Sequence, residues 1–311
     1  MGDRWPSGQP NVLYMLADDM RPELAYLSHG QLPIVTPFLD KLASKSAYFD
    51  NAFNQAAVCV PSRASFLSGM RPYATSIISN DQRLRFGSAG ELKYAGVSAF
   101  RAAGYATAGI GKIGHKHEAH PDYTLSHTGS TDLLHAPCNE EGAQNRRMHA
   151  PDQFVSCRVQ GNNFRDEGVR KHALEALRTL AKHPAPFFMI VGFLRPHVPD
   201  HVPTWAMRQQ PPVDWTEPPR QPLPRLSPLR SGKGGSTNST RAEKERLQRW
   251  ECAQGAPKGA SVDAIHAICL RHAKRVYRAA VTYTDHNMGV LLKELGLLRV
   301  RNQTIVVMHS E

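Results

Sequence analysis

The chain has 311 residues, 41% of them hydrophobic and 21% charged, which is typical of a globular protein that can bury a large core without disulfide support. Its formal net charge of +11 would suit a nucleic-acid partner, but over half of the excess lies between residues 220 and 249, where eight basic residues face two acidic ones. That segment is rich in Pro, Gly and Ser and lacks a basic stripe with interleaved aromatics, so we interpret it as a solvated loop and predict no nucleic-acid partner.

The predicted elements alternate between helices and buried strands along the chain. Apolar runs and helical spacings predict, in order, a strand at 11–17, helices at 38–47, 61–70 and 91–103, a strand at 105–110, a helix at 166–182, a strand at 186–193, a helix at 276–295 and a strand at 304–308. This alternation predicts an α/β fold with a central, mostly parallel sheet and helices on both faces. We assign residues 1–311 to one domain, with an irregular excursion at 115–163 and a Pro-rich, basic loop at 196–262.

Two adjacent carboxylates, Asp18 and Asp19, directly follow the first predicted strand. Like charges repel each other, so a fold that keeps both ionised at the end of a buried strand favours a hard divalent cation that neutralises them. The alternative is a solvated strand end at which one aspartate caps a turn. The pair alone does not decide between these interpretations.

Cys59 lies two residues before Pro61, which is typical of the first position of a helix. The free backbone N–H groups at a helix start favour anions and lower the pKa of a thiol, so we expect a lowered pKa for Cys59. Arg63, one turn into the helix, can reach back with a planar guanidinium suited to an oxyanion. The alternative is a buried structural cysteine that happens to precede a helix.

The cysteine count and the apolar runs limit the cellular compartments in which the protein is expected. No C-x-x-C pair occurs, and an odd count leaves at least one thiol unpaired among Cys59, Cys138, Cys157, Cys252 and Cys269. No apolar run reaches the roughly 18 residues that cross a bilayer, and the start MGDRWPSGQP lacks the apolar core of a signal peptide. We therefore expect no membrane span, and either a cytosolic protein or one whose true N-terminus has been lost.

The string CVPSRASFLSG at residues 59–69 resembles the signature of the sulfatase family, C-x-P-S-R followed by a short segment that ends in Gly. The resemblance continues through NVLYMLADDMRPEL at the first strand, GYAT and GKIGH at 104–115, FLRPHVP at 193–199, and residues 277–292. Within the family, the chain resembles the iduronate sulfatases through the DDMRP form of the first motif, the K-x-x-H spacing and the R-P-H-x-P run. The resemblance implies an alkaline-phosphatase-like sandwich and a sulfuric ester hydrolase that acts on sulfate monoesters, as of a sulfated sugar or glycosaminoglycan.

The resemblance also implies roles for individual residues. Cys59 would be oxidised to formylglycine by a formylglycine-generating enzyme. A Ca²⁺ ion would be held by Asp18, Asp19, Cys59 and Glu311. The residues that would hold the formylglycine and line the sulfate pocket are Arg63, Lys112, His115 and His197. Each of these has a plainer interpretation, since Lys112 can be a solvated lysine, His115 lies among other histidines, and His197 can stabilise a rigid loop between two prolines.

The chain departs from the family pattern after the last predicted strand. Glu311 falls where the family has an aspartate, and the next metal ligand and the C-terminal subdomain have no counterpart. We therefore expect a C-terminally truncated chain with exposed strand edges and apolar faces. Two alternatives stay open: an inactive, truncated binding protein, or a phosphate or phosphonate ester hydrolase, although related phosphohydrolases carry Ser or Thr at position 59. The resemblance further suggests a lysosomal, secreted or periplasmic setting and a disulfide between Cys138 and Cys157.

Overall fold

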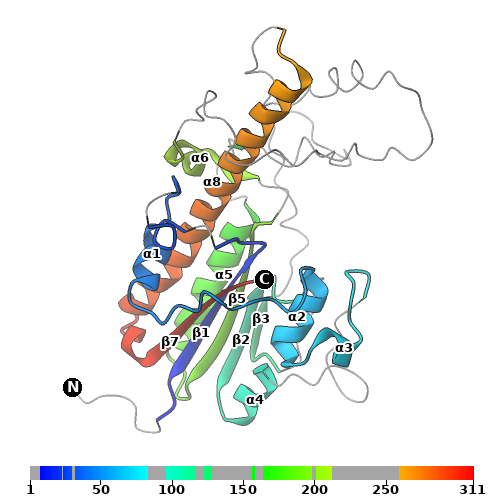
Figure 1. The fold of residues 1–311 in the computed structure, drawn as a ribbon. Helices are drawn as coiled ribbons and strands as arrows, with labels where there is room; N and C mark the ends of the chain where they lie inside the picture. The colour runs from blue at the N-terminus through cyan, green and yellow to red at the C-terminus, as the bar shows by residue number, and fades with distance from the viewer. Residues whose placement is uncertain are drawn as a thin grey trace, which may run out of the picture.

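The computed structural model describes residues 8–22, 24–29, 32–82, 96–115, 122–127, 156–157, 164–197, 201–211 and 259–311. Its centre is a five-stranded, entirely parallel sheet in the order β3-β2-β5-β1-β7 (Figure 1). The strands are β1 (Asn11–Asp18), β2 (Ala106–Gly111), β3 (Leu125–His127), β5 (Phe187–Pro196) and β7 (Thr304–Ser310). A separate parallel pair joins β4 (Ser156–Cys157) to β6 (Val202–Pro203).

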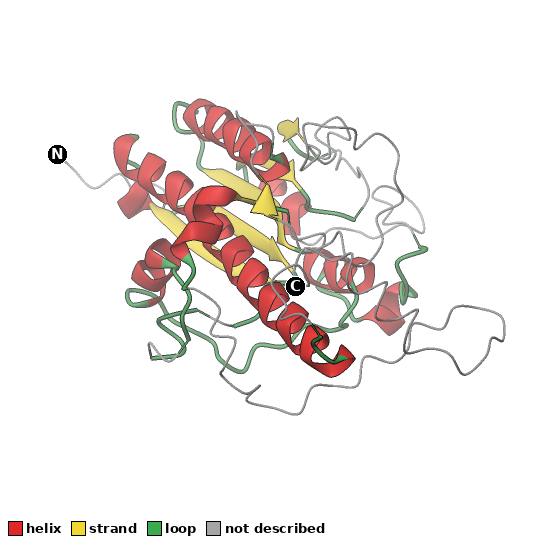
Figure 2. Ribbon diagram, turned by 90° about the horizontal axis from the view of Figure 1, so that it is seen from above, coloured by secondary structure: helices red, strands yellow, loops and turns green. Residues whose placement is uncertain are grey.

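The central strands are apolar on both faces because helices cover both sides of the sheet (Figure 2). On one side lie α1 (Pro37–Ala43), α5 (Arg165–Leu180) and α8 (Val262–Leu297), packed on Leu13 and Met15 of β1. On the other side, α2 (Cys59–Ser68) and α4 (Gly96–Ala102) pack on Val12 and Leu16 of the same strand. The short helices are α3 (Pro72–Thr75), α6 (Thr204–Gln209) and the 3-10 turn η4 (Arg301–Gln303).

The α/β architecture with helices on both faces is as predicted, whereas the start of α8 and the content of two segments predicted as irregular are not. Helix α8 begins at Val262 instead of residue 276, because the side chain of Ser261 caps it by accepting a hydrogen bond from the Ala264 N–H at 3.2 Å. Within the predicted irregular excursion, β3 pairs with β2 and extends the sheet. Within the predicted Pro-rich loop, β6 and α6 form ordered structure. Most of both segments lies outside the described residues, so their limits stay a prediction.

The described cysteines and helices address two further expectations. Cys59 is a free thiol and Cys269 is disulfide-bonded, whereas the side chains of Cys138 and Cys157 lie outside the described residues. Among the helices of the described ranges, none is long and apolar enough to cross a membrane.

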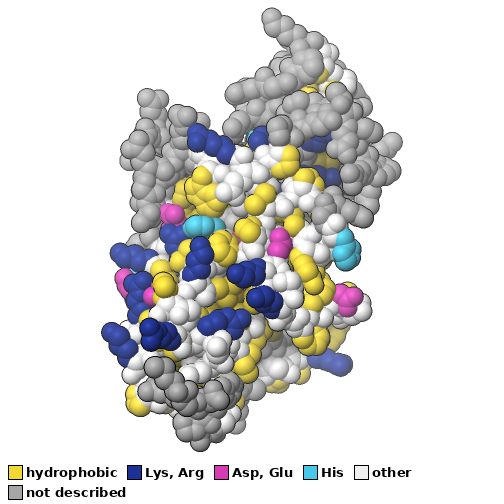
Figure 3. Space-filling model, turned by 90° about the vertical axis from the view of Figure 1, so that its left-hand side faces the viewer, with side chains coloured by type: hydrophobic (Ala, Val, Ile, Leu, Met, Phe, Trp, Pro, Cys, Tyr) yellow, Lys and Arg dark blue, Asp and Glu magenta, His cyan; other side chains and the backbone are white. Residues whose placement is uncertain are grey.

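Strand β7 forms one edge of the sheet, and its outward side is only partly covered. Ile305 and Val307 are 49% and 39% exposed, as expected for an incompletely covered strand edge. Viewed from the left-hand side of Figure 1, the molecule carries Lys and Arg side chains scattered around patches of hydrophobic surface (Figure 3).

Candidate functional site

The candidate site lies where the carboxyl ends of β1, β5 and β7 meet the N-terminal turn of α2. Asp18 is the last residue of β1, and the register with β5 shifts between Ala17 and Asp18, so that Asp18 lies opposite Pro196. Asp19 follows with a φ of 59°, a left-handed conformation that aspartate tolerates better than most residues. The carboxyl ends of parallel strands are the usual place for a ligand in an open α/β sheet.

Asp18 is the centre of a fully buried charge cluster. Its Oδ1 accepts a hydrogen bond from Arg63 Nη2 at 3.1 Å, and its Oδ2 pairs with Lys112 Nζ. Arg63 also pairs with Glu311, whose backbone N–H lies 3.4 Å from the carbonyl oxygen of Ala17. These charges lose their hydration on burial, so the paired geometry is what makes the cluster tolerable.

The guanidinium of Arg63 is anchored on its other side by backbone. Nη1 donates to the carbonyl oxygens of Lys112 at 2.6 Å and Ile113 at 2.8 Å. Lys112 in turn lies beside β5, where a Cβ added to Gly192 would be 1.8 Å from the Lys112 carbonyl oxygen. Only glycine at position 192 permits this approach, so β5 sets the place of the chain that carries Lys112.

The pKa values of Asp18 and Glu311 are shifted in opposite directions. Burial raises the pKa of Glu311 to about 9, and its hydrogen bond to Asp18 acts in the same direction and outweighs the charge of Arg63. Burial opposes ionisation of Asp18 as well, but the hydrogen bond from Glu311 and the charges of Arg63 and Lys112 hold its pKa well below the usual range. Near neutral pH, Asp18 is therefore ionised and Glu311 is protonated.

Cys59 is the first residue of α2, and its Sγ lies 3.9 Å from Asp18 Oδ1. Burial and the negative charge of Asp18 raise the pKa of the thiol to about 11. The predicted lowering of this pKa is therefore wrong, since desolvation and the nearby carboxylates outweigh the helix start. The helix also begins at Cys59 and not at Pro61. At neutral pH the group is a protonated thiol, which is a poor nucleophile.

The half-exposed Asp19 and His197 complete the open side of the site. His197 Nε2 lies 3.6 Å from Asp19 Oδ2, with side-chain exposures of 26% and 51%. Burial raises the pKa of Asp19, against the opposing charge of His197. His115 is half-buried on the segment after β2, and it belongs to neither group of converging ligand atoms described next.

Two groups of ligand atoms converge around Cys59. In each, the atoms lie within 4.8 Å of one another: Asp19, Cys59 and His197 form one, and Asp18, Cys59 and Glu311 form the other. The predicted ligands Asp18, Asp19, Cys59 and Glu311 are thus brought together. Carboxylate oxygens are the ligands that Ca²⁺ prefers, and Asp18, Asp19 and Glu311 offer them around Cys59, so these residues fit such an ion.

Sequence reasoning missed two residues that hold the backbone of the site. Asp166, buried at the start of α5, accepts hydrogen bonds from the N–H groups of Leu194 and Arg195, both at 2.8 Å, just before His197. The hydroxyl of Tyr277 on α8 lies 3.2 Å from the Asp19 carbonyl oxygen. An acidic residue in the first turn of a helix is a common stabilising feature, so the sequence carried no signal that Asp166 reaches a distant strand.

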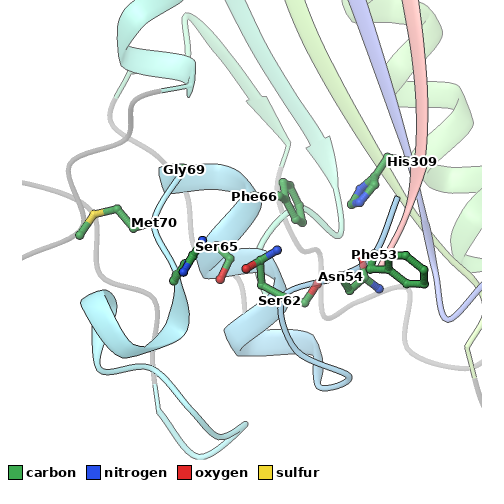
Figure 4. A pocket seen from close by; sticks show the side chains of 10 residues that line it. Phe53, Asn54, Ser62, Ser65, Phe66, Gly69, Met70 and His309 are labelled. Carbon is green, nitrogen blue, oxygen red and sulfur yellow. The ribbon is translucent and has the colours of Figure 1, made fainter. Parts of the chain in front are cut away.

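A third missed residue is His309 on β7. Its ring lies 5.2 Å from that of Phe66 on α2 and 6.2 Å from that of Tyr14 on β1. Burial, together with the charge of Arg63, lowers the pKa of His309, so its imidazole is neutral at pH 7. Figure 4 shows His309 beside Phe66, and both line a cavity next to α2.

Comparisons with known proteins place this arrangement in a family. The chain is 28% identical over 318 residues to iduronate 2-sulfatase from Homo sapiens and 24% identical over 334 residues to an arylsulfatase from Clostridium perfringens (strain 13 / Type A). Both alignments cover 97% of this chain, but the chain spans only 54% and 63% of the two relatives.

A solved structure has the same fold as this chain. The phosphonate monoester hydrolase of Agrobacterium radiobacter superposes with a TM-score of 0.66 at 18% identity, covering 97% of this chain and 62% of that one. This likeness confirms the predicted alkaline-phosphatase-like α/β fold. The family model described as Sulfatase matches residues 10–310, almost the whole chain. The chain therefore belongs to the sulfatase family.

Proposed function

We propose that this chain carries the catalytic centre of a sulfuric ester hydrolase that cleaves sulfate monoesters of a sulfated sugar or glycosaminoglycan. The observation that carries the proposal is the convergence of Cys59, Asp18, Arg63 and Lys112 at the carboxyl ends of the strands. The likeness to an iduronate 2-sulfatase over nearly the whole chain supports the substrate class.

The unmodified thiol is unsuited to the reaction. With a pKa of about 11, Cys59 stays protonated, and a thiol attached to the first turn of α2 offers neither a hydroxyl nor a thiolate. We propose that Cys59 is converted to formylglycine by a formylglycine-generating enzyme. Formylglycine, once hydrated, supplies a hydroxyl nucleophile for the sulfur atom.

The other side chains divide the remaining tasks. Asp18, Asp19 and Glu311, together with the modified Cys59, would hold a Ca²⁺ ion, which supplies positive charge to the sulfate oxygens. Arg63 is fixed by two backbone carbonyls, so it orients the group at position 59 with little reorganisation during the reaction.

Lys112 and two histidines would complete the sulfate pocket. Lys112 can face an anion once Ca²⁺ occupies the Asp18 carboxylate that now pairs with it. His197, on the open side beside Asp19, is suited to protonate a leaving alcohol. His115 is assigned to the same pocket through the family motif alone.

The test is hydrolysis by the 311-residue chain. The protein is co-expressed with a formylglycine-generating enzyme, mass spectrometry of the peptide that contains Cys59 measures conversion, and release of 4-nitrophenol from 4-nitrophenyl sulfate is followed with added Ca²⁺ or with a chelator. We expect Ca²⁺-dependent hydrolysis that Cys59→Ala abolishes. Calcium binding with modified Cys59 but no turnover would favour the inactive binding protein. Faster release from a 4-nitrophenyl phosphonate ester would favour the phosphonate hydrolase.

A further inference from the structure

The three ligand atoms that converge on the open side of the site are of different chemical types. Asp19 offers a carboxylate oxygen, Cys59 a sulfur and His197 an imidazole nitrogen, and the three atoms lie within 4.8 Å of one another. Ca²⁺ prefers oxygen ligands, so only Asp19 suits it. Thiolate, imidazole and carboxylate are together the ligands that Zn²⁺ takes in proteins. As long as Cys59 retains its sulfur, this group is therefore better suited to Zn²⁺ than to Ca²⁺.

The spacing of these atoms is close to that of a zinc site. In tetrahedral coordination, bonds of about 2.0–2.3 Å from Zn²⁺ to nitrogen, oxygen and sulfur put neighbouring ligand atoms roughly 3.3–3.6 Å apart. His197 Nε2 and Asp19 Oδ2 are 3.6 Å apart, which agrees with this spacing. The sulfur of Cys59 then has to come closer to these two atoms by at most about 1.5 Å. Rotation of the partly exposed side chains of Asp19 and His197 can supply this movement.

Hydrogen bonds hold the backbone on both sides of the group. The hydroxyl of Tyr277 donates to the carbonyl oxygen of Asp19 at 3.2 Å and accepts from the N–H of Arg21 at 2.7 Å. The carbonyl oxygen of His197 accepts a hydrogen bond from Arg195 Nη1 at 3.1 Å. A ligand set whose backbone is held in place loses little conformational freedom when an ion binds.

The charges around the group also allow a divalent cation. Arg63 and Lys112 would repel such an ion, but both are paired with the buried carboxylate of Asp18. The carboxylate of Asp19 and the thiolate of Cys59 carry two negative charges, which equal the charge of Zn²⁺. Binding forms a Zn–S bond and releases the thiol proton to solvent, with no change in oxidation state. The ion reaches these ligands from solvent because the side chain of Asp19 is half-exposed.

We propose that Asp19, Cys59 and His197 bind Zn²⁺ while Cys59 is an unmodified cysteine, with a water molecule as the fourth ligand. Asp19 and Cys59 are also proposed ligands of Ca²⁺, so the two ions exclude each other. Zn²⁺ therefore holds the unconverted chain in a form that does not take Ca²⁺ at this site. The inference concerns the unmodified thiol, so it holds whether or not the converted chain hydrolyses sulfate esters.

The test uses the full 311-residue chain expressed without a formylglycine-generating enzyme, and mass spectrometry verifies that Cys59 is unmodified. Isothermal titration calorimetry measures Zn²⁺ binding in the presence of millimolar Ca²⁺. We expect Cys59→Ser and His197→Ala each to weaken one Zn²⁺ site at least about tenfold, since loss of even an indirect partner of a metal ligand costs roughly 10–100-fold. Co²⁺ then replaces Zn²⁺ for absorption spectroscopy. A thiolate ligand gives Co²⁺ an intense charge-transfer band, and Cys59→Ser should reduce this band.

His183→Ala is the matched control, because His183 is an exposed histidine just before β5, whereas His197 follows the other end of that strand. It should leave the Zn²⁺ affinity unchanged. Absence of Zn²⁺ binding, or an affinity that Cys59→Ser and His197→Ala leave intact, would overturn the inference. A Co²⁺ charge-transfer band that is equal in Cys59→Ser and the parent chain would do the same. Circular dichroism verifies that each variant is folded, and His197→Ala, at a partly exposed side chain, tests the site even if Cys59→Ser does not fold.

Discussion

Replacement of Arg63 by lysine is the sharpest test of how the site is held together. The guanidinium is fully buried and serves four partners, namely the carbonyls of Lys112 and Ile113 and the carboxyls of Asp18 and Glu311. A lysine ammonium keeps the charge but cannot reproduce the planar fork that reaches both sides at once.

The magnitude follows from the partners that are lost. Breaking a buried ion pair costs roughly 3–5 kcal/mol, and a buried carbonyl left without a donor costs roughly 1–3 kcal/mol. Because lysine retains the charge and can reach one side of the site, we expect Arg63→Lys to lower the free energy of unfolding by about 3 kcal/mol, a large share of the roughly 5–15 kcal/mol that stabilises a typical domain.

Urea-induced unfolding, followed by tryptophan fluorescence, measures this loss as a lower midpoint at an unchanged slope. The control is Arg208→Ala, which removes an exposed arginine of α6 that takes no part in the buried cluster. A substitution at an exposed side chain usually changes stability little, so the control should hardly shift the midpoint. An Arg63→Lys midpoint equal to that of the control would refute the claim that buried contacts of Arg63 organise the site.

Three further predictions concern single carboxylates. Asp166→Ala should lower the thermal midpoint, because it removes two hydrogen bonds to a carboxylate, each worth roughly 1.5–3 kcal/mol. Asp166→Asn should lower the midpoint less, and equal midpoints for the two variants would contradict this prediction. Burial raises the pKa of Asp285 from 3.8 to about 7, although Asp285 accepts hydrogen bonds from the N-terminal turn of α1. Between these pH values the folded state therefore holds a proton that the unfolded state has lost. The free energy of unfolding should fall as pH rises from about 4 to 7. Urea unfolding across that pH range should give a free energy of unfolding that changes less with pH for Asp285→Asn than for the parent chain. Millimolar Ca²⁺ should raise the thermal midpoint, and Asp19→Ala, a change at a half-exposed side chain, should remove that increase; an identical increase in the variant would exclude Asp19 as a ligand.

The parts of the fold that the sequence predicts are those set by local pattern. Short continuous apolar runs rich in β-branched and aromatic residues favour strands with both faces covered, which is why the predicted limits of β1, β2 and β5 lie within three residues of those in the structure. The pair Asp18 and Asp19 was recognised because a strand end is visible in the sequence. The start of α8 was missed although Ile265, Ile268 and Cys269 continue its apolar spacing before residue 276, and the cap at Ser261 marks where the helix begins.

The parts that were mispredicted or missed depend on contacts between distant segments. The helix start at Cys59 is a local feature and predicts a lowered pKa, whereas burial and the Asp18 carboxylate, 41 positions away, raise it. The contact of Tyr277 with Asp19 joins residues 258 positions apart. No local pattern encodes such pairs, so a sequence can name the residues of a site without giving their protonation states.

The net charge of the site affects which class of ester it binds best. Arg63 and Lys112 balance the carboxylates of Asp18 and Asp19 while Glu311 retains a proton. Binding of a divalent cation would lower the pKa of Glu311 and release that proton, so the site would gain one net positive charge. A sulfate monoester or a phosphonate monoester, each a monoanion, neutralises one charge, whereas a phosphate monoester dianion overcompensates it. At pH 8, a non-hydrolysed sulfate monoanion should therefore inhibit hydrolysis of 4-nitrophenyl sulfate more strongly than a phosphate monoester does. The reverse order of inhibition would show that this charge balance does not govern selectivity.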